Sequence, residues 1–337
     1  MAGWMIYTGG QEPHDGLDRL PDPPPWRAFA GGPPLPTPDT DSGSSHDARS
    51  YRPVQAAVEQ VNAALYLRRP LLVTGPPGTG KSTLAYAVAH ELRLGSVLHW
   101  PITSRVTLQD GLYQYDPLTR LYAASKQEVT PAPGDEEDIG RYVRLGPLGT
   151  SLLPYSRPRV LLIDEIDKSD IDLANDLLTI FEKGEYQIVE LARQESPVAE
   201  VMTADGTDRV SITRGTIRCR AFPLVIMTSN GEREFPPAFL RRCLTVRLSL
   251  PESENELADI VRAHLGGMAD LSADLIARFF QRKRIGALAT DQLLNAIYLT
   301  HHVSTPGETN RIVLADRVMP FLSELNPESD LSNASDD

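Results

Sequence analysis

An eight-residue segment, residues 75–82, restricts this chain to a small group of folds. It reads Gly-Pro-Pro-Gly-Thr-Gly-Lys-Ser and matches the pattern G-x-x-x-x-G-K-[ST] at every fixed position. A short apolar run, residues 70–74, precedes it, and a helical pattern, residues 82–92, follows it. In such a strand–loop–helix unit, backbone N–H groups of the loop converge on phosphate oxygens at the helix N-terminus. The segment therefore predicts a binding site for a nucleoside triphosphate.

Two residues of this loop have distinct predicted roles. Lys81 is expected to reach the β- and γ-phosphates, and the Ser82 hydroxyl is expected to coordinate Mg²⁺. A plain Gly/Pro turn is the alternative, but the complete motif between a strand and a helix favours the phosphate loop. The candidate nucleotide-binding residues are Gly75, Pro76, Pro77, Gly78, Thr79, Gly80, Lys81, Ser82 and Thr83.

The composition is that of an ordinary globular protein, with 41% hydrophobic and 23% charged residues. Cys219 and Cys243 have no metal-ligand spacing and cannot form a disulfide framework, which suits a reducing compartment. No signal peptide is expected, and the longest apolar runs are too short to span a bilayer. These observations predict a cytoplasmic protein without a membrane segment.

The net charge of −12 is concentrated at the two ends of the chain. Residues 1–50 account for −4 and residues 251–337 for −7, so the middle is close to neutral. A strongly acidic chain is poorly suited to sequence-independent DNA binding, which depends on neutralising phosphates. The near-neutral middle weakens this objection, and nucleic acid stays an open but less favoured partner.

The chain divides into four regions by composition and pattern. Residues 1–50 are rich in Pro and Gly and predict a linker or surface arm, residues 51–250 an α/β core, residues 251–325 a small helical domain, and residues 326–337 an acidic, disordered tail. Apolar residues within the arm could instead anchor it to the core or to a neighbouring subunit. These are Trp4, Ile6, Tyr7, Trp26 and Phe29.

Five apolar runs in the core predict strands. They are residues 70–74, 97–100, 159–163, 222–227 and 244–250. Because helical stretches separate them, they indicate a parallel α/β sheet. Beyond residue 251 the patterns are helical, at residues 254–265, 270–284, 289–302 and 311–325.

The predicted strand over residues 159–163 leads directly into two carboxylates, Asp164 and Glu165. In a fold built around a phosphate loop, such a strand ends beside that loop, where a metal-linked acid is needed. Asp164 is expected to hold Mg²⁺ through its water shell, and Glu165 is expected to polarise the attacking water.

Three further residues complete the candidate catalytic set. Asn230 follows a strand that ends in small polar residues, so its amide is expected near the γ-phosphate; an ordinary turn asparagine is the alternative. Arg241 and Arg242 precede the last predicted strand. Arginines stabilise the charge of phosphoryl transfer and are often supplied in trans. The alternative for this pair is a solvated turn.

Together these residues resemble an AAA+ ATPase of the MoxR-like, dynein-related branch. The resemblance covers residues 51–325 and is most specific at the Walker A loop, residues 75–82, and the Walker B strand, residues 160–165. It implies a P-loop NTPase αβα core with a parallel five-stranded sheet, and a helical C-terminal lid. It also implies a homo-oligomeric ring, commonly a hexamer, with ATP and Mg²⁺ at the subunit boundaries.

The same resemblance assigns roles to the remaining candidates. Asn230 matches sensor 1. Residues 239–243 are similar to the Leu-x-Ser-Arg-Cys box of clamp-loader subunits, which favours Arg242 over Arg241 as the arginine finger. The family's sensor-2 arginine has no counterpart, because Asp291 stands at that position, and Lys283 or Arg284 could substitute.

Two long segments resemble insertions of this branch. Residues 101–158 are similar to its helix-2 insert, and residues 185–221 to its pre-sensor-1 hairpin. Strand-like alternation in the second segment falls at residues 186–191, 209–212 and 217–220, with turn residues at 205–206 and 214–215. In such rings these elements face the pore or a partner; plain surface decoration is the alternative.

The expected function is Mg²⁺-dependent ATP hydrolysis that drives a ring to remodel or activate a partner protein, as a chaperone does. The resemblance suggests a protein client, often one with a von Willebrand factor A domain. A nucleic-acid-stimulated motor is one alternative. A nucleotide-binding switch or scaffold with little turnover is the other.

Overall fold

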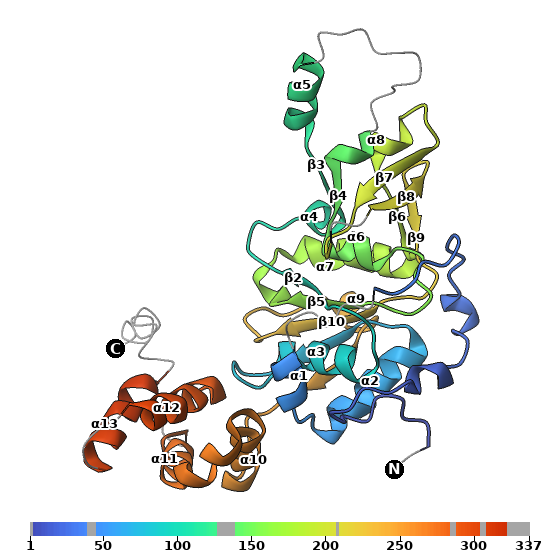
Figure 1. Ribbon diagram of the computed structural model, residues 1–337. Helices are drawn as coiled ribbons and strands as arrows, with labels where there is room; N and C mark the ends of the chain where they lie inside the picture. Colours follow the sequence, from blue (N-terminus) through green and yellow to red (C-terminus); the bar gives the residue numbers. More distant parts are fainter. Residues whose placement is uncertain are drawn as a thin grey trace, which may run out of the picture.

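The computed structural model describes residues 3–38, 45–126, 139–206, 209–283, 288–303 and 308–321. At its centre is a five-stranded parallel sheet in the order β11-β1-β10-β5-β2 (Figure 1). The strands are β1 (Leu71–Thr74), β2 (Leu98–Pro101), β5 (Val160–Asp164), β10 (Leu224–Ser229) and β11 (Leu244–Arg247). The predicted α/β fold with five parallel strands is confirmed.

Helices cover both faces of this sheet, which gives the expected αβα layers. One face carries α2 (Gln55–Leu67) and α3 (Lys81–Glu91), and the other carries α6 (Pro147–Ser151) and α7 (Ile171–Lys183). Successive residues of β5 enter alternate layers: Val160 and Leu162 pack with the first helix pair, and Leu161 and Ile163 with the second. Burial on both faces explains why the central strands are continuously apolar.

A second sheet of six strands joins two regions that are far apart in the sequence. Its order is β3-β4-β7-β8-β9-β6. The strands are β3 (Tyr113–Tyr115), β4 (Val143–Leu145), β6 (Glu185–Gln187), β7 (Val198–Met202), β8 (Arg209–Thr213) and β9 (Thr216–Arg218). β3 and β4 belong to the predicted helix-2 insert, and the other four to the predicted hairpin region. The sheet that unites the two insertions was not expected from the sequence.

The strand predicted over residues 186–191 is wrong beyond Gln187. Val189–Ala192 forms the short helix α8 instead. The partner strand β9 begins at Thr216, which pairs with Gln187. Residues 214–215, both with positive φ, form the tight turn that joins β8 to β9. Because β9 offers no further partner at this end, the chain leaves the ladder.

Short helices connect the remaining elements. The insert contains α4 (Leu108–Leu112), α5 (Pro117–Lys126) and the 3₁₀ helix η3 (Ile139–Tyr142), and α5 extends away from the sheets (Figure 1). Two further short elements follow strands of the central sheet, namely η4 (Ile166–Lys168) and α9 (Pro237–Leu240). The first, η4, directly follows the residues that end β5, and the second, α9, directly precedes the residues that lead into β11.

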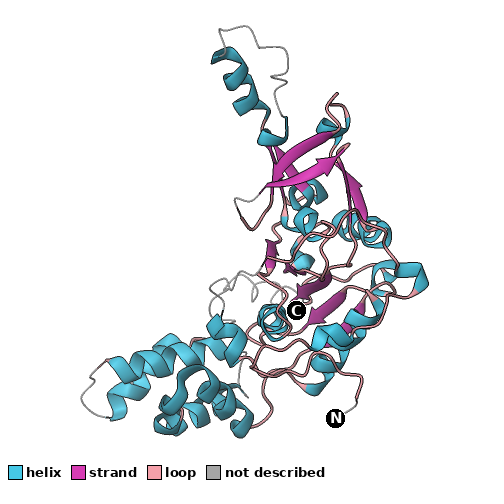
Figure 2. Cartoon of the chain, turned by 45° about the vertical axis from the view of Figure 1, so that its right-hand side comes forward, coloured by secondary structure: helices cyan, strands magenta, loops and turns pink. Residues whose placement is uncertain are grey.

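The C-terminal helices form a separate unit with its own core (Figure 2). They are α10 (Glu254–Leu265), η5 (Gly266–Met268), η6 (Asp270–Ser272), α11 (Ala273–Lys283), α12 (Thr290–His302) and α13 (Glu308–Val318). Arg284 and the predicted tail, residues 326–337, lie outside the described residues. Within the described ranges, no helix has the length and apolar character that a bilayer crossing requires.

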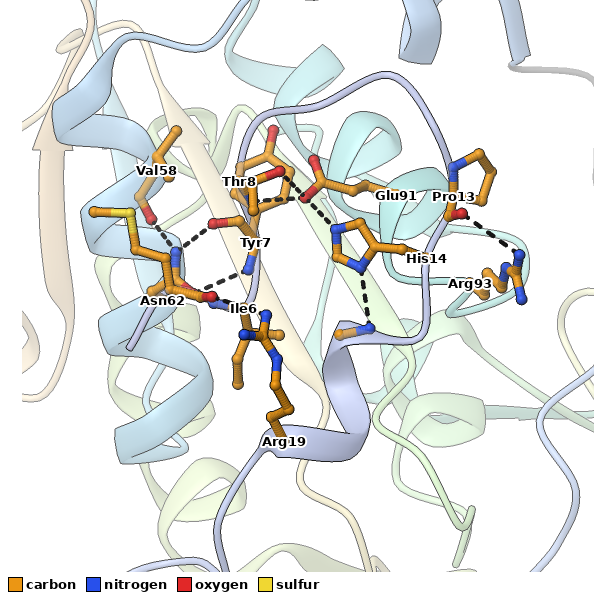
Figure 3. Close-up of polar contacts among 12 residues, drawn as sticks. Ile6, Tyr7, Thr8, Pro13, His14, Arg19, Val58, Asn62, Glu91 and Arg93 are labelled. Carbon is orange, nitrogen blue, oxygen red and sulfur yellow. Dashed lines mark hydrogen bonds and ion pairs between the residues drawn. The ribbon is translucent and has the colours of Figure 1, made fainter. Parts of the chain in front are cut away.

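The start of the N-terminal arm is fastened to α2 and α3 rather than free. The buried Asn62 Oδ1 accepts hydrogen bonds from the backbone N–H groups of Ile6 (2.6 Å) and Tyr7 (3.0 Å), and its Nδ2 donates to the Tyr7 carbonyl (2.7 Å; Figure 3). On α3, Glu91 Oε1 accepts from the Thr8 backbone N–H (2.6 Å) and lies 2.9 Å from His14 Nε2. A free linker does not describe this segment.

The apolar anchors of the arm divide into two groups. Ile6, Tyr7 and Phe29 pack against the core, whereas Trp4 and Trp26 are exposed. Along the arm lie η1 (Gly16–Arg19) and η2 (Pro25–Arg27), and α1 (Ser45–Ser50) precedes the core. The arm thus follows the surface of the core over most of its described length.

Replacing Asn62 with alanine should lower the free energy of unfolding by about 3 kcal/mol, because buried backbone groups of Ile6 and Tyr7 lose partners that water cannot replace. Denaturant unfolding measures the change, and amide hydrogen exchange locates it at the start of the arm. Gln55→Ala, at the exposed start of the same helix, is the matched control and should have little effect. Equal stability of the two variants would contradict a fastened arm.

Candidate active site

The phosphate loop joins β1 to α3, and its shape requires glycine. Gly75, Gly78 and Gly80 have φ values of 151°, 75° and 76°. A Cβ atom on Gly75 would lie 2.3 Å from the Leu248 carbonyl oxygen, and one on Gly80 would lie 2.7 Å from the Tyr51 ring. Backbone conformation and close neighbours therefore both exclude side chains here, as a loop that binds phosphates through its backbone needs.

Lys81 is the first residue of α3, and its ammonium group lies inside the loop. Its Nζ donates hydrogen bonds to the carbonyl oxygens of Gly75 (2.8 Å) and Pro76 (2.9 Å). Burial lowers the pKa of Lys81, and nearby carboxylates, Asp167 foremost, oppose that shift. The loop thus presents a cation among backbone groups, which suits phosphate oxygens.

Asp164 ends β5 and gathers the polar side chains of three other strands and helices. Its Oδ1 accepts hydrogen bonds from Ser82 Oγ and Thr228 Oγ1, both at 2.6 Å, and its Oδ2 lies 3.4 Å from His99 Nε2. Burial raises the pKa of this carboxyl, but the interactions with these three side chains outweigh burial and lower the pKa to about 2. Asp164 is therefore ionised at neutral pH and lies against Ser82, the other residue that the sequence suggests as a metal ligand.

Glu165, the candidate that polarises water, has an unusual backbone conformation. Its φ is 60°, in the left-handed region, and its N–H donates to Thr228 Oγ1 (2.8 Å). The carboxylate is partly exposed and forms an ion pair with Lys168 Nζ at 2.6 Å. Exposed pairs of this kind contribute about 0–1 kcal/mol, so the Glu165 carboxylate can exchange this partner readily.

Asn230 lies directly after β10, beside the phosphate loop. The last residue of β10, Ser229, pairs with Thr74 at the end of β1, and its carbonyl accepts from the Gly75 N–H (3.3 Å). The backbone N–H of Asn230 donates to Oδ2 of the buried Asp167 (2.9 Å). The structure therefore brings the predicted sensor to the same edge of the sheet as the loop.

Asp167 holds the turn that follows Asn230. Its Oδ2 also accepts from the backbone N–H groups of Gly231 (2.9 Å) and Glu232 (3.0 Å). Its Oδ1 is buried and has no hydrogen-bond partner among the described residues. One carboxylate on η4 thus ties the turn after β10 to the turn after β5.

Arg241 and Arg242 lie at the other edge of the sheet from the phosphate loop of their own chain. They precede β11, whose first residue Leu244 pairs with Leu71, whereas its last residue pairs with Thr74 beside the loop. Because the two strands are parallel, the start of β11 lies at the start of β1. The structure therefore does not bring these arginines together with the other candidates within one chain.

The two arginines differ in how they are held. The partly exposed Arg242 Nε donates to Glu182 at the end of α7. Arg69 donates hydrogen bonds to the carbonyl oxygens of both Arg241 and Arg242, and the distance from its Nε to the Arg242 oxygen is 3.1 Å. The Arg242 guanidinium thus has a defined position at the surface, and hydrogen bonds from Arg69 hold the backbone that carries it.

A cavity of about 760 Å³ lies between the phosphate loop and the helical lid. Residues of the loop, of the segment before α2, and of α10 and α12 line it. The lining residues from the segment before α2, from the loop and from the start of α3 include Tyr51, Arg52, Gly78, Thr79, Gly80 and Thr83. Pockets of this size take small-molecule ligands, and this one adjoins the phosphate loop.

Asp291, which replaces the sensor-2 arginine, lines this cavity from the first turn of α12. The start of α12 packs on the loop, since a Cβ atom on Gly78 would lie 2.9 Å from the Thr290 nitrogen. Lys283, one suggested substitute, donates to the Pro251 carbonyl (2.5 Å), and burial lowers its pKa. Arg262 of α10 also lines the cavity, a position that the sequence did not suggest.

Sequence reasoning missed three residues that support the site: Thr228, His99 and Asp167. Thr228 belongs to the small polar run that indicated Asn230, so a signal was present. His99 and Asp167 carry no such signal, because a lone histidine in a strand and an acid after a strand are common surface residues. Their roles depend on the pairing of β2 with β5 and on the fold of η4.

Comparisons with known proteins give one family match and two similar solved structures. The family model of the AAA domain (dynein-related subfamily) matches residues 70–243. The solved Thermotoga maritima RuvB Holliday junction branch migration motor has 16% identity and a TM-score of 0.41, over 84% of this chain and 72% of that chain. A variant of the same RuvB has 16% identity and a TM-score of 0.42, over 78% and 66%. No curated protein sequence matches the chain.

The family match spans more than half of the 337 residues. It contains the phosphate loop, Asp164, Glu165, Asn230 and Arg242, and it ends just before β11. Four of the five strands of the central sheet, β1, β2, β5 and β10, also lie within the matched residues. The chain therefore belongs to the dynein-related subfamily of AAA domain proteins.

Proposed function

We propose that this protein is a Mg²⁺-dependent ATPase that works as a ring and uses hydrolysis to remodel or activate a partner protein. The observation that supports this best is the division of the candidate residues between two edges of one sheet. Lys81, Asp164 and Glu165 gather at one edge, and Arg242 lies at the other. A head-to-tail ring would join the two halves into complete sites.

Phosphate binding rests on the loop backbone, the start of α3 and Lys81. Ser82 and Asp164 would hold Mg²⁺, and they fit it, because their oxygens lie together and Asp164 is ionised at neutral pH. When bound, the ion neutralises phosphate charge and orients the phosphate groups. The choice of ATP follows from the family.

Glu165 would orient the water that attacks the γ-phosphate in line and would accept its proton. Its left-handed backbone and the hydrogen bond to Thr228 fix the start of this side chain beside Asp164. Asn230 would bind the γ-phosphate or the water from the neighbouring strand. Catalysis would then be mainly positioning and electrostatics.

Arg242 would reach the nucleotide of the next subunit and stabilise the charge that develops on the γ-phosphate. The lid helices α10 and α12 line the cavity beside the loop, so a change of nucleotide would act on them directly. Motion of the lid would pass through a ring, most commonly of six subunits, to the client. The expected partner is a protein client, for example one with a von Willebrand factor A domain, and the protein itself is expected in the cytoplasm.

The test is ATP turnover per subunit measured against protein concentration, with light scattering to follow assembly. A composite site predicts turnover that rises steeply as rings form, by about 10³-fold or more if the trans arginine is required. Equal turnover in monomer and ring would reject the composite site. DNA and RNA are added in a salt titration: a flat response supports a protein client, and salt-sensitive stimulation favours a nucleic-acid motor. Negligible turnover in fully formed rings would favour the switch or scaffold.

A further inference from the structure

The N-terminal arm contacts the two segments that hold the candidate arginine finger. Arg27, at the end of η2, donates from Nε to the Arg68 carbonyl (2.9 Å) and from Nη1 to the Phe181 carbonyl (2.7 Å). Arg68 in turn donates from Nη2 to the carbonyl of Pro21 (2.7 Å). One guanidinium of the arm thus bridges the turn after α2 and the end of α7.

The residues that hold Arg242 are next in sequence to those that Arg27 contacts. Arg69, which follows Arg68, donates to the Arg242 carbonyl, and Glu182, which follows Phe181, pairs with the Arg242 side chain. Arg27 therefore fixes the backbone beside both supports of the finger. An exposed ion pair contributes little to order by itself, so the backbone beneath it decides where the guanidinium lies.

Arg27 is itself firmly placed. Its guanidinium carbon lies 4.6 Å from the centre of the Phe222 ring and 5.3 Å from that of Phe29. The two rings stack at 5.3 Å, and a Cβ atom on Gly184 would lie 2.5 Å from Phe29 Cδ1, so the arm packs tightly here. Burial lowers the pKa of Arg27, and its shift also reflects the charges of Arg69 and Glu182.

We propose that Arg27 is a positioning residue for the arginine finger, so that the N-terminal arm belongs to the half of the active site that each subunit lends to its neighbour. This inference rests on the proposed ring ATPase. The physical basis is a chain of contacts from Arg27 through residues 68–69 and 181–182 to Arg242. A displacement of the finger by about 1 Å is enough to reduce catalysis strongly.

The first measurement is ATP turnover of Arg27→Ala in assembled rings. We expect turnover to fall about tenfold or more, because the finger loses its orientation, while binding of a fluorescent ATP analogue stays unchanged. Arg27→Lys should restore little, since a single ammonium cannot reach both carbonyls as the forked guanidinium does. Arg19→Ala is the matched control, because this exposed arm arginine donates to the Met5 carbonyl within the arm.

Mixed rings separate a positioning role from a merely structural one. Arg27→Ala subunits keep an unaltered phosphate loop and Glu165, and Glu165→Gln subunits keep a correctly oriented finger. A boundary that combines these two halves should therefore be active. Random mixing in equal amounts should restore roughly a quarter of wild-type turnover, since one boundary in four pairs a sound loop with a sound finger. A mixture of Arg27→Ala with Arg242→Ala should show no rescue and stay at or below the turnover of Arg27→Ala alone, because neither subunit supplies a correctly oriented finger.

Two results would overturn the inference. Turnover of Arg27→Ala equal to that of Arg19→Ala would show that the finger does not need the arm. If turnover of Arg27→Ala is reduced and Glu165→Gln subunits fail to rescue it, the defect lies elsewhere in the subunit. If the alanine variant does not assemble, the same assay is carried out with Arg27→Lys. The reference mixture of Arg242→Ala with Glu165→Gln must recover activity; if it stays inactive, the ring ATPase itself is rejected.

Discussion

Replacing Glu165 with glutamine should lower ATP turnover by about 10²- to 10⁴-fold, the range that a positioned general base contributes. Glutamine keeps the shape of the side chain but cannot accept the proton of the attacking water. The residues that bind phosphate and metal, Lys81, Ser82 and Asp164, are unchanged, so affinity for ATP should be preserved. The variant should therefore hold ATP in assembled rings without hydrolysing it.

Steady-state turnover and equilibrium binding of ATP test this expectation together. Glu232→Gln is the matched control, because it removes an exposed carboxylate from the turn after Asn230 and should leave turnover unchanged. If Glu165→Gln hydrolyses ATP as fast as the control, the assignment of Glu165 is wrong. Since the stalled variant should retain its client, affinity purification with it is also the most direct way to identify that client.

Replacing Arg242 with alanine should lower turnover by about 10³-fold, because an arginine supplied in trans stabilises the charge of the transition state. Binding of ATP should change little, since Arg242 lies at the far edge of the sheet from its own phosphate loop. The loss should appear under conditions in which the wild-type chain assembles and reaches its full turnover.

Arg241→Ala is the informative comparison for this variant. Arg241 is the second candidate for the finger, but the Arg242 side chain is the one that pairs with Glu182 at the surface. A loss for Arg242→Ala much larger than that for Arg241→Ala would confirm the assignment. The reverse order would move the finger to Arg241, and full activity of both variants would remove the trans arginine from the mechanism.

The phosphate loop and the parallel sheet could be predicted because their signals are local. Three glycines at positive φ, a lysine and a hydroxyl lie within residues 75–82, and the loop conformation depends mainly on those residues. The continuous apolar runs predicted buried strands for the same reason. The common position of Asp164, Glu165 and Asn230 could be predicted as well, since the carboxyl ends of neighbouring parallel strands meet at one edge of the sheet.

The second sheet and the arm could not be predicted, because neither depends on a local pattern. Residues 189–192 alternate like a strand but form α8, since β9 ends where their partner would be needed. The Pro-rich arm reads as a linker, yet one buried asparagine, Asn62, binds its backbone over a separation of 55 residues. The contacts that decide these segments join positions far apart in the sequence.

From its residues alone this chain is recognisable as an AAA domain protein with a phosphate loop, and its candidate metal ligand Asp164 and candidate catalytic Glu165 can be named, because each of these groups lies within a short segment of characteristic sequence. The position of Arg242 away from its own loop, the bridge of Arg27 beneath it and the role of Asp167 required the folded structure. Those features arise where strands and helices distant in sequence pack together, and packing brings together backbone carbonyls and side chains that no short motif records.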